Sequence, residues 1–358
     1  MRPSIKRNIL HLITDTDVGG VRTALEVLLN SRLSQEFHFS TLFTNQAIQQ
    51  LRGNSLKPDL IVFHTACSWS AIPKLFCLKW FSKIAIYEHH YNDSFEVKVP
   101  SPLRFHLMLW LSYAIADRVI AVSQAQANWM YQHRLVNPKK LKIVTPARAL
   151  DRMLEVPEIS ASEISNPEAE ALPSSLSLGT YGRFAPEKGF DILIESIKRV
   201  PSLLPDLTVK LYIGGYGDQE DHLKALAHSS NNIEFVGIVK DVAQFLQKCD
   251  VVVIPSRREA WGIVCMEAKA AARPVIACTV GGLVEQILVG SSPSLEADYG
   301  VLVPPENPEV LAQAIAQIGA LPKTTLREIG KRSRESVRHS LEVYISKWEE
   351  LILEVLKH

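Results

Sequence analysis

Residues 251–278 read VVVIPSRREAWGIVCMEAKAAARPVIAC and place two apolar runs on either side of a helix-forming segment. The β-branched run 251–256 predicts a buried strand, and the run 274–278 predicts a second one. The residues after Gly262 are good helix formers and predict a helix between the two strands. Two neighbouring strands joined by a helix run parallel, so this stretch predicts an α/β fold.

The same alternation of strand and helix patterns continues along the whole chain. In the first half the predicted strands are 8–13, 37–44, 59–65, 83–88, 118–123 and 142–145. In the second half they are 176–182, 208–214, 233–237, 251–256, 274–278 and 300–304. Continuous apolar strands with helices between them imply parallel sheets that are covered on both faces.

The length and the break in pattern near residue 150 predict two Rossmann-like domains facing each other across a cleft. We expect an N-terminal domain over 1–150 and a C-terminal domain over 176–340. Residues 151–175 are rich in Ser, Pro and Glu and predict a linker or exposed loop, while 341–358 predicts a helix that caps one of the domains. Ligands of such domains bind at the carboxyl ends of the strands, so the cleft is the expected site.

The composition is that of a globular protein, with 47% hydrophobic and 22% charged residues in 358. The five cysteines form neither a metal-spaced cluster nor a disulfide framework, which favours a reducing, cytoplasmic location. The N-terminal apolar run is poor for a signal peptide, and the longest apolar stretch, 105–116, is too short to span a bilayer. We therefore expect no transmembrane anchor.

The charge of the chain is unevenly distributed. Residues 1–150 hold 18 basic and 9 acidic side chains, whereas the remainder holds 21 basic and 29 acidic ones. The first half should therefore prefer anionic surfaces, unless the two halves have simply drifted in charge.

Two cations follow the predicted strand 176–182. Arg183 and Lys188 lie in a loop at its carboxyl end, and a helix is predicted from about Gly189. Side-chain cations beside a helix N-terminus predict an anion site, because the backbone N–H groups and the helix dipole add to their charge. The alternative is that both are ordinary solvated loop cations.

Two glutamates follow the predicted strand 251–256. Glu259 falls in the loop at the strand end, and Glu267 falls on the next helix. Two acceptor-only groups at different depths of one cleft suit a ligand with several hydroxyls, one holding a sugar ring and the other a ribose. The alternative is a capping or salt-bridging Glu259 and a solvent-facing Glu267.

Paired glycines stand between a strand and a helix at Gly281-Gly282 and at Gly19-Gly20. Such pairs let backbone amides approach a phosphate, although most simply mark tight turns. At the end of strand 83–88, Glu88, His89, His90 and Asp93 are possible metal ligands. Adjacent histidines diverge and no third ligand has suitable spacing, so we favour a polar contact to a sugar and expect no metal.

The blocks GRFAPEKGFDILIES, LYIGGYGDQEDHL, the segment from IEFVG to VEQI and YGVLVPPENPEVLAQAI, in this order, resemble the retaining glycosyltransferases of family 4 with the GT-B fold. The resemblance is strong over about 176–318. It is looser over the first half, in VGGVRTALEVLL and ADRVIAVSQAQANWM. It implies that the C-terminal domain binds a nucleotide-sugar and the N-terminal domain binds the acceptor.

The resemblance also implies residue roles. Arg183 and Lys188 would neutralise the donor diphosphate, Glu259 would lie beside the donor sugar, and Glu267 would hold the ribose hydroxyls. His89 would lie near the donor sugar. The implied catalytic set is Glu259, His89, Arg183 and Lys188, and the further donor-site residues are Gly20, Gly262, Ile263, Val264, Glu267, Gly281 and Gly282. The family needs no metal cofactor, since Arg and Lys stand in its place.

The function implied is transfer of a hexosyl unit from a nucleotide-diphosphate sugar, with uridine the favoured base. The acceptor would be a glycan, a lipid-linked molecule or a small molecule, and the pathway would be the synthesis of cell-envelope polysaccharide or glycoconjugate. The alternatives are a catalytically degenerate nucleotide-sugar-binding protein and another GT-B enzyme, such as a sugar-nucleotide epimerase. The basic first half, with KLFCLKWFSK and FHLMLWLSYA, suits peripheral contact with an anionic membrane, but both runs could equally be core helices. We expect no nucleic-acid partner.

Two departures from the family pattern are visible. The segment TPARALD (145–151) stands where the family usually has Pro-Asn-Gly, so this loop could contact ligands differently. Ala272 replaces a usual glycine, and we expect only local packing to change.

Overall fold

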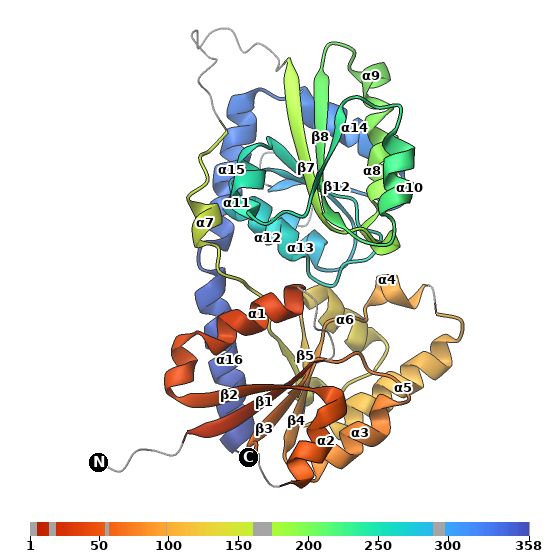
Figure 1. Cartoon of the computed structure of the whole chain (residues 1–358). Coiled ribbons are helices and arrows are strands. Elements are labelled where there is room, and N and C mark those ends of the chain that lie inside the picture. Colours follow the sequence, from red (N-terminus) through yellow and green to blue (C-terminus); the bar gives the residue numbers. More distant parts are fainter. Residues whose placement is uncertain are drawn as a thin grey trace. The chain divides into compact units, whose positions relative to one another are not determined.

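The structure is a computed structural model of the chain, and it describes residues 6–13, 19–53, 57–97, 99–159, 174–288 and 298–357. The chain forms two compact units. Unit 1 comprises residues 1–148 and 340–358, and unit 2 comprises residues 149–339. Each unit is built on a parallel six-stranded sheet flanked by helices (Figure 1). All the strands predicted from the sequence are present, with ends within two residues of the prediction.

The sheet of unit 1 has the strand order β2-β1-β3-β4-β5-β6. Its strands are β1 (Arg7–Ile13), β2 (Phe37–Phe43), β3 (Leu60–Phe63), β4 (Lys83–Glu88), β5 (Arg118–Ala121) and β6 (Leu141–Ile143). Its helices are α1 (Gly20–Leu29), α2 (Thr44–Arg52), α3 (Ala71–Lys79), α4 (Asp93–Glu96), α5 (Pro102–Ile115), α6 (Gln124–Gln132) and α16 (Ser340–Lys357). The chain moves one way from β1 to β2 and the other way from β3 onward. Right-handed crossovers therefore place α1 on one face and α2, α3, α5 and α6 on the other.

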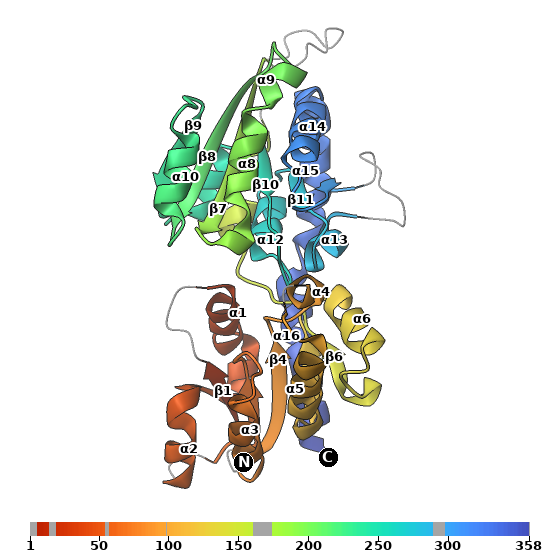
Figure 2. The same cartoon turned by 90° about the vertical axis from the view of Figure 1, so that its right-hand side faces the viewer.

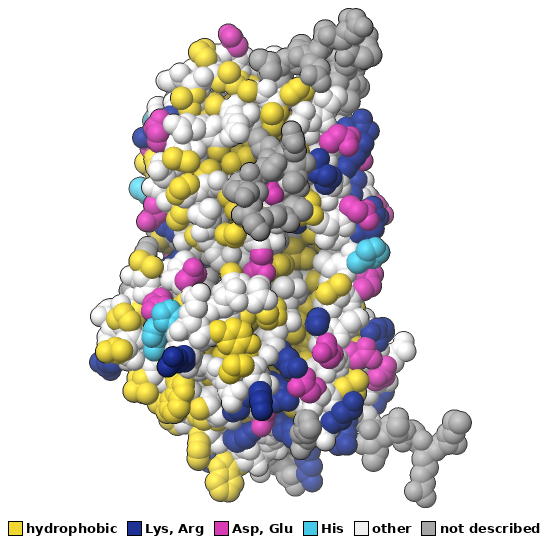
Figure 3. Space-filling view, turned by 180° about the vertical axis from the view of Figure 1, so that it is seen from behind, with side chains coloured by type: hydrophobic (Ala, Val, Ile, Leu, Met, Phe, Trp, Pro, Cys, Tyr) yellow, Lys and Arg dark blue, Asp and Glu magenta, His cyan; other side chains and the backbone are white. Residues whose placement is uncertain are grey.

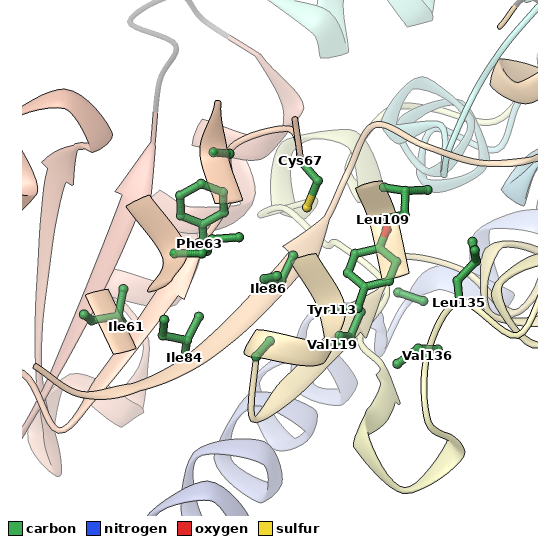
Figure 4. Packing of buried hydrophobic residues seen from close by; sticks show 14 of the residues in the cluster. Ile61, Phe63, Cys67, Ile84, Ile86, Leu109, Tyr113, Val119, Leu135 and Val136 are labelled. Carbon is green, nitrogen blue, oxygen red and sulfur yellow. The ribbon is translucent and has the colours of Figure 1, made fainter. Parts of the chain in front are cut away.

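One face of this sheet is closed by a continuous apolar core. Ile61, Phe63, Ile84 and Ile86 point from β3 and β4 toward Leu109 and its neighbours on α5 (Figure 4). These residues have almost no exposed surface, because successive strand side chains alternate and every second one enters this layer.

The opposite face of the same sheet is covered by α1 and by the C-terminal helix α16. Tyr344 and Trp348 of α16 are buried, and the Tyr344 hydroxyl donates to the carbonyl of Ala24 in α1 at 3.1 Å. At the end of α16, Glu354 forms ion pairs with Arg118 (2.9 Å) and Lys142 (2.5 Å). The final helix expected from the sequence therefore packs on the sheet formed by the first half of the chain.

The sheet of unit 2 has the order β12-β11-β10-β7-β8-β9. Its strands are β7 (Ser175–Arg183), β8 (Thr208–Tyr216), β9 (Ile233–Gly237), β10 (Val251–Ile254), β11 (Val275–Cys278) and β12 (Gly300–Val303). Its helices are α7 (Asp151–Leu154), α8 (Phe190–Ile197), α9 (Val200–Leu203), α10 (Glu220–Ala227), α11 (Val242–Gln247), α12 (Ile263–Ala270), α13 (Gly282–Ile287), α14 (Pro308–Gly319) and α15 (Lys323–Val337). Helices α8, α10 and α14 pack together on one face, and α12, α13 and α15 on the other (Figures 1 and 2).

The strand order of unit 2 reverses between β7 and β10. From β7 the chain adds β8 and β9 on one side, and it then returns to add β10, β11 and β12 on the other. Such a reversal leaves a crevice at the carboxyl ends of the two central strands, which is where α/β sheets bind ligands. The loops after β7 and β10 are therefore the first place to look for a site.

Two expectations about the C-terminal half need comment. Most of the expected linker, residues 160–173, lies outside the described residues, and the part before it contains the short helix α7. Our expectation that Ala272 changes only local packing is wrong. Its φ is 54°, a left-handed conformation that strains a residue with a side chain, so the backbone itself bears the consequence.

Candidate functional site

A partly buried ion pair lies where the strand order of unit 2 reverses. Lys188 follows β7 and Glu259 follows β10, and these strands are hydrogen-bonded neighbours. The Lys188 Nζ and the Glu259 Oε2 are 2.7 Å apart, and the two side chains retain 27% and 18% of their exposure. The structure thus brings together two site residues that are distant in sequence.

Gly189 lets the Lys188 loop lie against the end of β10. Residues Pro186–Lys188 form a 3-10 turn, and Gly189 follows it with φ 68°, in the left-handed region. A Cβ at this position would lie 2.0 Å from the carbonyl oxygen of Pro255. A glycine is therefore required on two counts, the dihedral angle and the close approach of two backbone segments.

Arg257 ties the same two loops together and was missed in the sequence analysis. It makes a two-pronged ion pair with Asp191 at 2.8 and 2.7 Å, and it donates to the Pro186 carbonyl at 2.7 Å. A second carboxylate, that of Glu306, lies 3.0 Å from its Nε. Burial alone would raise the pKa of Asp191, but the hydrogen bonds from Arg257 lower it below its usual value. Both charges therefore persist near neutral pH and hold the Lys188 loop.

Arg183 lies at the end of β7 and is largely exposed. Its guanidinium is 3.2 Å from Glu187, four residues later, and its side chain keeps 67% of its exposure. An exposed pair of this kind contributes little to stability, so Arg183 can turn toward an incoming anion at low cost. The predicted pair of cations is thus divided between an anchored Lys188 and an exposed Arg183.

Glu267 lies on α12 and is only 2% exposed. The hydroxyl of Tyr181, on β7, donates to its Oε2 at 2.5 Å. The alternative of a solvent-facing Glu267 is therefore wrong. Sequence reasoning missed Tyr181. The only signal was its position two residues before Arg183, because alternate residues of a strand point to the same face.

The glycines of the second half hold the loop after β10 against the start of α13. Gly262 and Gly281 have φ of 97° and 48°. The Gly282 N–H donates to the carbonyl of Ala260 at 3.2 Å, and a Cβ on Gly282 would lie 2.7 Å from the Trp261 ring. Ile263 and Val264 form the first turn of α12, and both side chains are half-buried. The close packing here requires small residues, so these glycines have a structural role, and their predicted contact with the donor stays a prediction.

Two further predicted residues, Gly20 and His89, lie in unit 1. Gly20 begins α1, and residues 14–18 of the loop before it lie outside the described part of the chain. His89 follows β4 and belongs to a row of three histidines that crosses neighbouring strands. His11 Nδ1 is 2.9 Å from His64 Nε2, and His64 Nδ1 is 3.1 Å from His89 Nε2.

The three histidines are neutral near pH 7. Burial, together with the neighbouring His90, lowers the pKa of His64 to about 3. Burial likewise lowers the pKa values of His11 and His89 well below the usual value, and each is lowered further by His64. His89 is therefore suited to hydrogen bonding and not to acting as a proton donor at neutral pH.

One of the possible metal ligands beside His89, Glu88, has hydrogen-bond partners within unit 1. Glu88 is buried and accepts hydrogen bonds from the Tyr113 hydroxyl (3.0 Å) and from the backbone N–H groups of His90 (2.9 Å) and Tyr91 (3.2 Å). This carboxylate orders the turn that follows β4, and that turn places His89.

Unit 1 also contains a pocket of about 370 Å³ at the carboxyl ends of β2 and β3. Hydroxyl groups dominate its polar lining, and the Thr44 and Thr65 hydroxyls are 2.7 Å apart. Lys74 of α3 contributes a cation, and Phe43 and Phe63 contribute apolar walls. The sequence analysis did not find this pocket, because its residues come from two separate segments, 43–45 and 63–74.

Two family models match the chain, one in each unit. Residues 12–152 match the model described as Glycosyltransferase Family 4, and residues 175–320 match Glycosyl transferases group 1. A D-inositol 3-phosphate glycosyltransferase of Salinispora arenicola is 31% identical over 232 residues, covering 60% of this chain and 49% of that protein. An uncharacterized glycosyltransferase of Methanocaldococcus jannaschii is 29% identical over 208 residues, covering 57% and 56%. The chain thus spans about half the length of these curated relatives.

Solved structures resemble the whole chain. Anabaena HepE in complex with UDP and glucose aligns with a TM-score of 0.70, covering 96% of this chain and 98% of HepE at 19% identity. Sucrose-phosphate synthase from Thermosynechococcus elongatus aligns with a TM-score of 0.77, covering 98% and 100% at 19% identity. These likenesses support the fold of two Rossmann-like units.

Proposed function

The chain belongs to the family 4 glycosyltransferases with the GT-B fold, and we propose that it transfers a hexosyl unit with retention of configuration from a nucleotide-diphosphate sugar to an acceptor hydroxyl. The observation that carries the proposal is the Lys188–Glu259 pair where the strand order of unit 2 reverses, with Arg183 at the end of β7. UDP-glucose is the first donor to test, because HepE has been solved with it.

The cations of this site suit the departing diphosphate. When the bond between the anomeric carbon and the phosphate oxygen breaks, negative charge develops on the diphosphate and positive charge on the sugar ring. Lys188 and Arg183 would stabilise the first, and Glu259 lies next to Lys188, where it would face the second. Charges held in place before the reaction need no reorganisation during it, which is why the anchoring by Arg257 matters.

The engagement of both glutamates favours attack from the leaving-group side. Glu259 is paired with Lys188, and Glu267 accepts from Tyr181, so each has a role that competes with attack on the anomeric carbon. The acceptor oxygen would form the new bond to that carbon on the face that the diphosphate leaves. Its proton would pass to the leaving phosphate oxygen. Retention follows without a covalent glycosyl-enzyme.

Unit 1 would supply the acceptor site. The pocket at the ends of β2 and β3 offers several hydroxyls and the cation of Lys74, which suits a polyhydroxylated acceptor with an anionic group. Lys74→Met should raise the acceptor KM severalfold and leave the donor Kd unchanged. An unchanged acceptor KM would remove the pocket from the proposal.

We also propose that unit 1 contacts an anionic membrane surface through an aromatic face on α3 and α5, defined by Phe76, Trp80, Leu103, Leu107 and Trp110. These side chains are 60%, 82%, 84%, 50% and 50% exposed. The two helices pack side by side, and Lys and Arg side chains accompany the exposed hydrophobic ones (Figure 3, lower left). The alternative, that KLFCLKWFSK and FHLMLWLSYA form core helices, holds for the opposite faces of these helices, where Leu75 and Leu109 are buried. No helix among the described residues is long and apolar enough to cross a bilayer.

The donor reaction is tested by incubating the chain with UDP-, GDP- and ADP-sugars and cell-envelope extract and following release of the nucleoside diphosphate. We expect one donor class to be consumed, and Glu259→Ala to lose turnover while donor binding persists. Binding without turnover in the wild type would indicate a degenerate binding protein. Conversion of the nucleotide-sugar itself would indicate an epimerase.

The membrane contact is tested by sedimentation with vesicles that contain anionic lipid. Removing the Trp80 and Trp110 rings together (Trp80→Ser/Trp110→Ser) should weaken binding by about tenfold or more, because each side chain would otherwise be withdrawn from water. Leu203→Ser, at an exposed apolar position of unit 2, is the matched control and should bind as the wild type does. Equal binding by all three proteins would refute the contact.

A further inference from the structure

Three side chains of zinc-ligand type converge in unit 1, away from the residues discussed so far. Glu96 ends α4, His106 lies in the second turn of α5, and His133 directly follows the last residue of α6. Each offers one ligand atom, and these atoms all lie within 4.8 Å of one another. Among the described residues, no other group of three or more His, Cys, Asp or Glu side chains is brought together in this way.

The distances suit a single ion between them. Glu96 Oε1 is 2.9 Å from His106 Nε2, and Glu96 Oε2 is 3.5 Å from His133 Nε2. Ligands that are about 2.0–2.1 Å from a tetrahedral zinc ion are roughly 3.3 Å apart, which lies between these two values. The two distances join different oxygens of Glu96, and all three ligand atoms lie within 4.8 Å of one another, so side-chain rotations that shorten the longest separation would place all three around one ion.

The surroundings of the carboxylate and of one imidazole also fit. The Trp129 indole N–H donates to Glu96 Oε2 at 2.7 Å and so orients the carboxylate, as outer-shell partners of metal ligands do. His106 Nε2 is shielded from solvent and makes no hydrogen bond of acceptable geometry, although the Glu96 oxygen is close. The in-plane direction of Nε2, which an N–H and a lone pair share, is therefore not aimed at that oxygen, and it leaves Nε2 available to an ion beside the carboxylate.

The end of α6 has a defined backbone conformation at His133, whose side chain is 35% exposed. Arg134 adopts a left-handed conformation with φ 52°, and the Leu135 N–H closes the helix end on the Met130 carbonyl at 3.0 Å. The His133 ring lies 4.6 Å from the His106 ring, measured between their centroids. The side chains from α5 and α6 are therefore neighbours before any ion binds.

We propose that Glu96, His106 and His133 bind a divalent transition-metal ion of the zinc class, with water in the fourth position. The ligand set of two imidazoles and one carboxylate is one that Zn²⁺ accepts, and it disfavours Mg²⁺ and Ca²⁺, which prefer oxygen ligands. The ion would link α4 to α5 and α6 and so fix the segment after β4. It is separate from the donor site, where Lys188 and Arg183 supply the positive charge.

The competing explanation is a simple ionic cluster in which Glu96 faces protonated histidines. It predicts no affinity for metal beyond that of scattered surface histidines. The proposal predicts one tight site per chain that depends on all three side chains. The two explanations therefore differ in a binding measurement that does not involve activity.

The experiment is a titration of the tag-free, chelator-treated full chain with Zn²⁺ alone by calorimetry, together with Co²⁺ absorption spectra. We expect one ion per chain and the strong visible bands of four-coordinate Co²⁺. His133→Gln and Glu96→Gln should each weaken binding by more than about tenfold, since loss of an outer-shell partner already costs about 10–100-fold. Trp129→Phe removes an outer-shell partner and should weaken Zn²⁺ binding by about 10–100-fold.

His222→Gln is the matched control, because His222 is an exposed histidine on α10 in unit 2. It should leave the Zn²⁺ affinity and the Co²⁺ spectrum unchanged. The proposal is overturned if no site of defined stoichiometry appears, or if His222→Gln weakens binding as much as His133→Gln does. It is also overturned if Co²⁺ gives only the weak bands of a six-coordinate ion, even where Zn²⁺ binds. Far-ultraviolet circular dichroism of each variant verifies that it is folded.

Discussion

The substitution Gly189→Ala should destabilise unit 2 and weaken donor binding, because it acts on the residue that positions Lys188. Gly189 has φ 68°, and an added Cβ would lie 2.0 Å from the Pro255 carbonyl oxygen and 3.0 Å from its carbon. Both contacts are with backbone, which cannot move aside as a flexible side chain could. The loop must therefore shift away from the end of β10.

The control variant Gly237→Ala separates the cost of the left-handed backbone from the cost of the steric clash. Gly237 has nearly the same φ, 69°, but nothing lies within 4 Å of the added Cβ. This control should be destabilised only by the strain of a left-handed alanine, less the reduced freedom of its unfolded chain, or about 0.5–1 kcal/mol. Gly189→Ala should be destabilised by that amount and by about 1–3 kcal/mol more for overpacking, or about 1.5–4 kcal/mol altogether.

The assay is thermal unfolding of both variants beside the wild type. For a unit of this size, about 1 kcal/mol corresponds to roughly 2–4 °C in Tm. We therefore expect a fall of a few degrees for Gly237→Ala and a clearly larger fall for Gly189→Ala, with donor affinity reduced only in the latter. Equal shifts in Tm would refute the close approach between Gly189 and Pro255, and unchanged donor affinity would refute its role in placing Lys188.

Three further predictions concern other features of the two units. Ala272→Gly should raise the stability of unit 2 by about 0.5–1 kcal/mol in thermal unfolding, because relief of a left-handed φ outweighs the added freedom of the unfolded chain; a fall in Tm would contradict this. Tyr181→Phe should cost about 1.5–3 kcal/mol and weaken donor binding, since a buried carboxylate loses a hydrogen bond; an unchanged Tm would show that the bond contributes nothing. Unit 1 should lose stability as the pH falls below about 6.5, because the unfolded histidines then bind protons that buried His11, His64 and His89 resist. The stabilisation is fully present above pH 6.5 and is lost as the pH falls toward the pKa of His64, about 3. The difference in unfolding free energy between the wild type and His64→Gln should therefore become smaller in acid, and a difference independent of pH would refute the prediction.

The fold was predictable because its strands are short β-branched runs with clear boundaries. Every such run became a strand, and the division into two sheets followed from the break near residue 150. The sequence also predicted that Lys188 and Glu259 both lie at the carboxyl ends of strands. It could not predict that these two strands are neighbours, because that depends on the strand order.

The parts that could not be predicted depend on contacts through space or on backbone dihedrals. Arg257 and Tyr181 are ordinary residues in the sequence, and their partners are 66 and 86 positions away. The strain at Ala272 is visible only in its φ. The apolar runs of α3 and α5 left two interpretations open, because each helix buries one face and exposes another.

The central claim is that the Lys188 site of unit 2 binds the diphosphate of a nucleotide-sugar. The direct measurement is calorimetric titration of UDP-, GDP- and ADP-glucose into the wild type, Lys188→Met and Lys224→Met, where Lys224 is an exposed lysine of α10 that serves as the control. We predict saturable one-to-one binding of one of them, weakened about tenfold or more by Lys188→Met and unchanged by Lys224→Met. Absence of saturable binding, or equal affinity in Lys188→Met and the wild type, would contradict the claim.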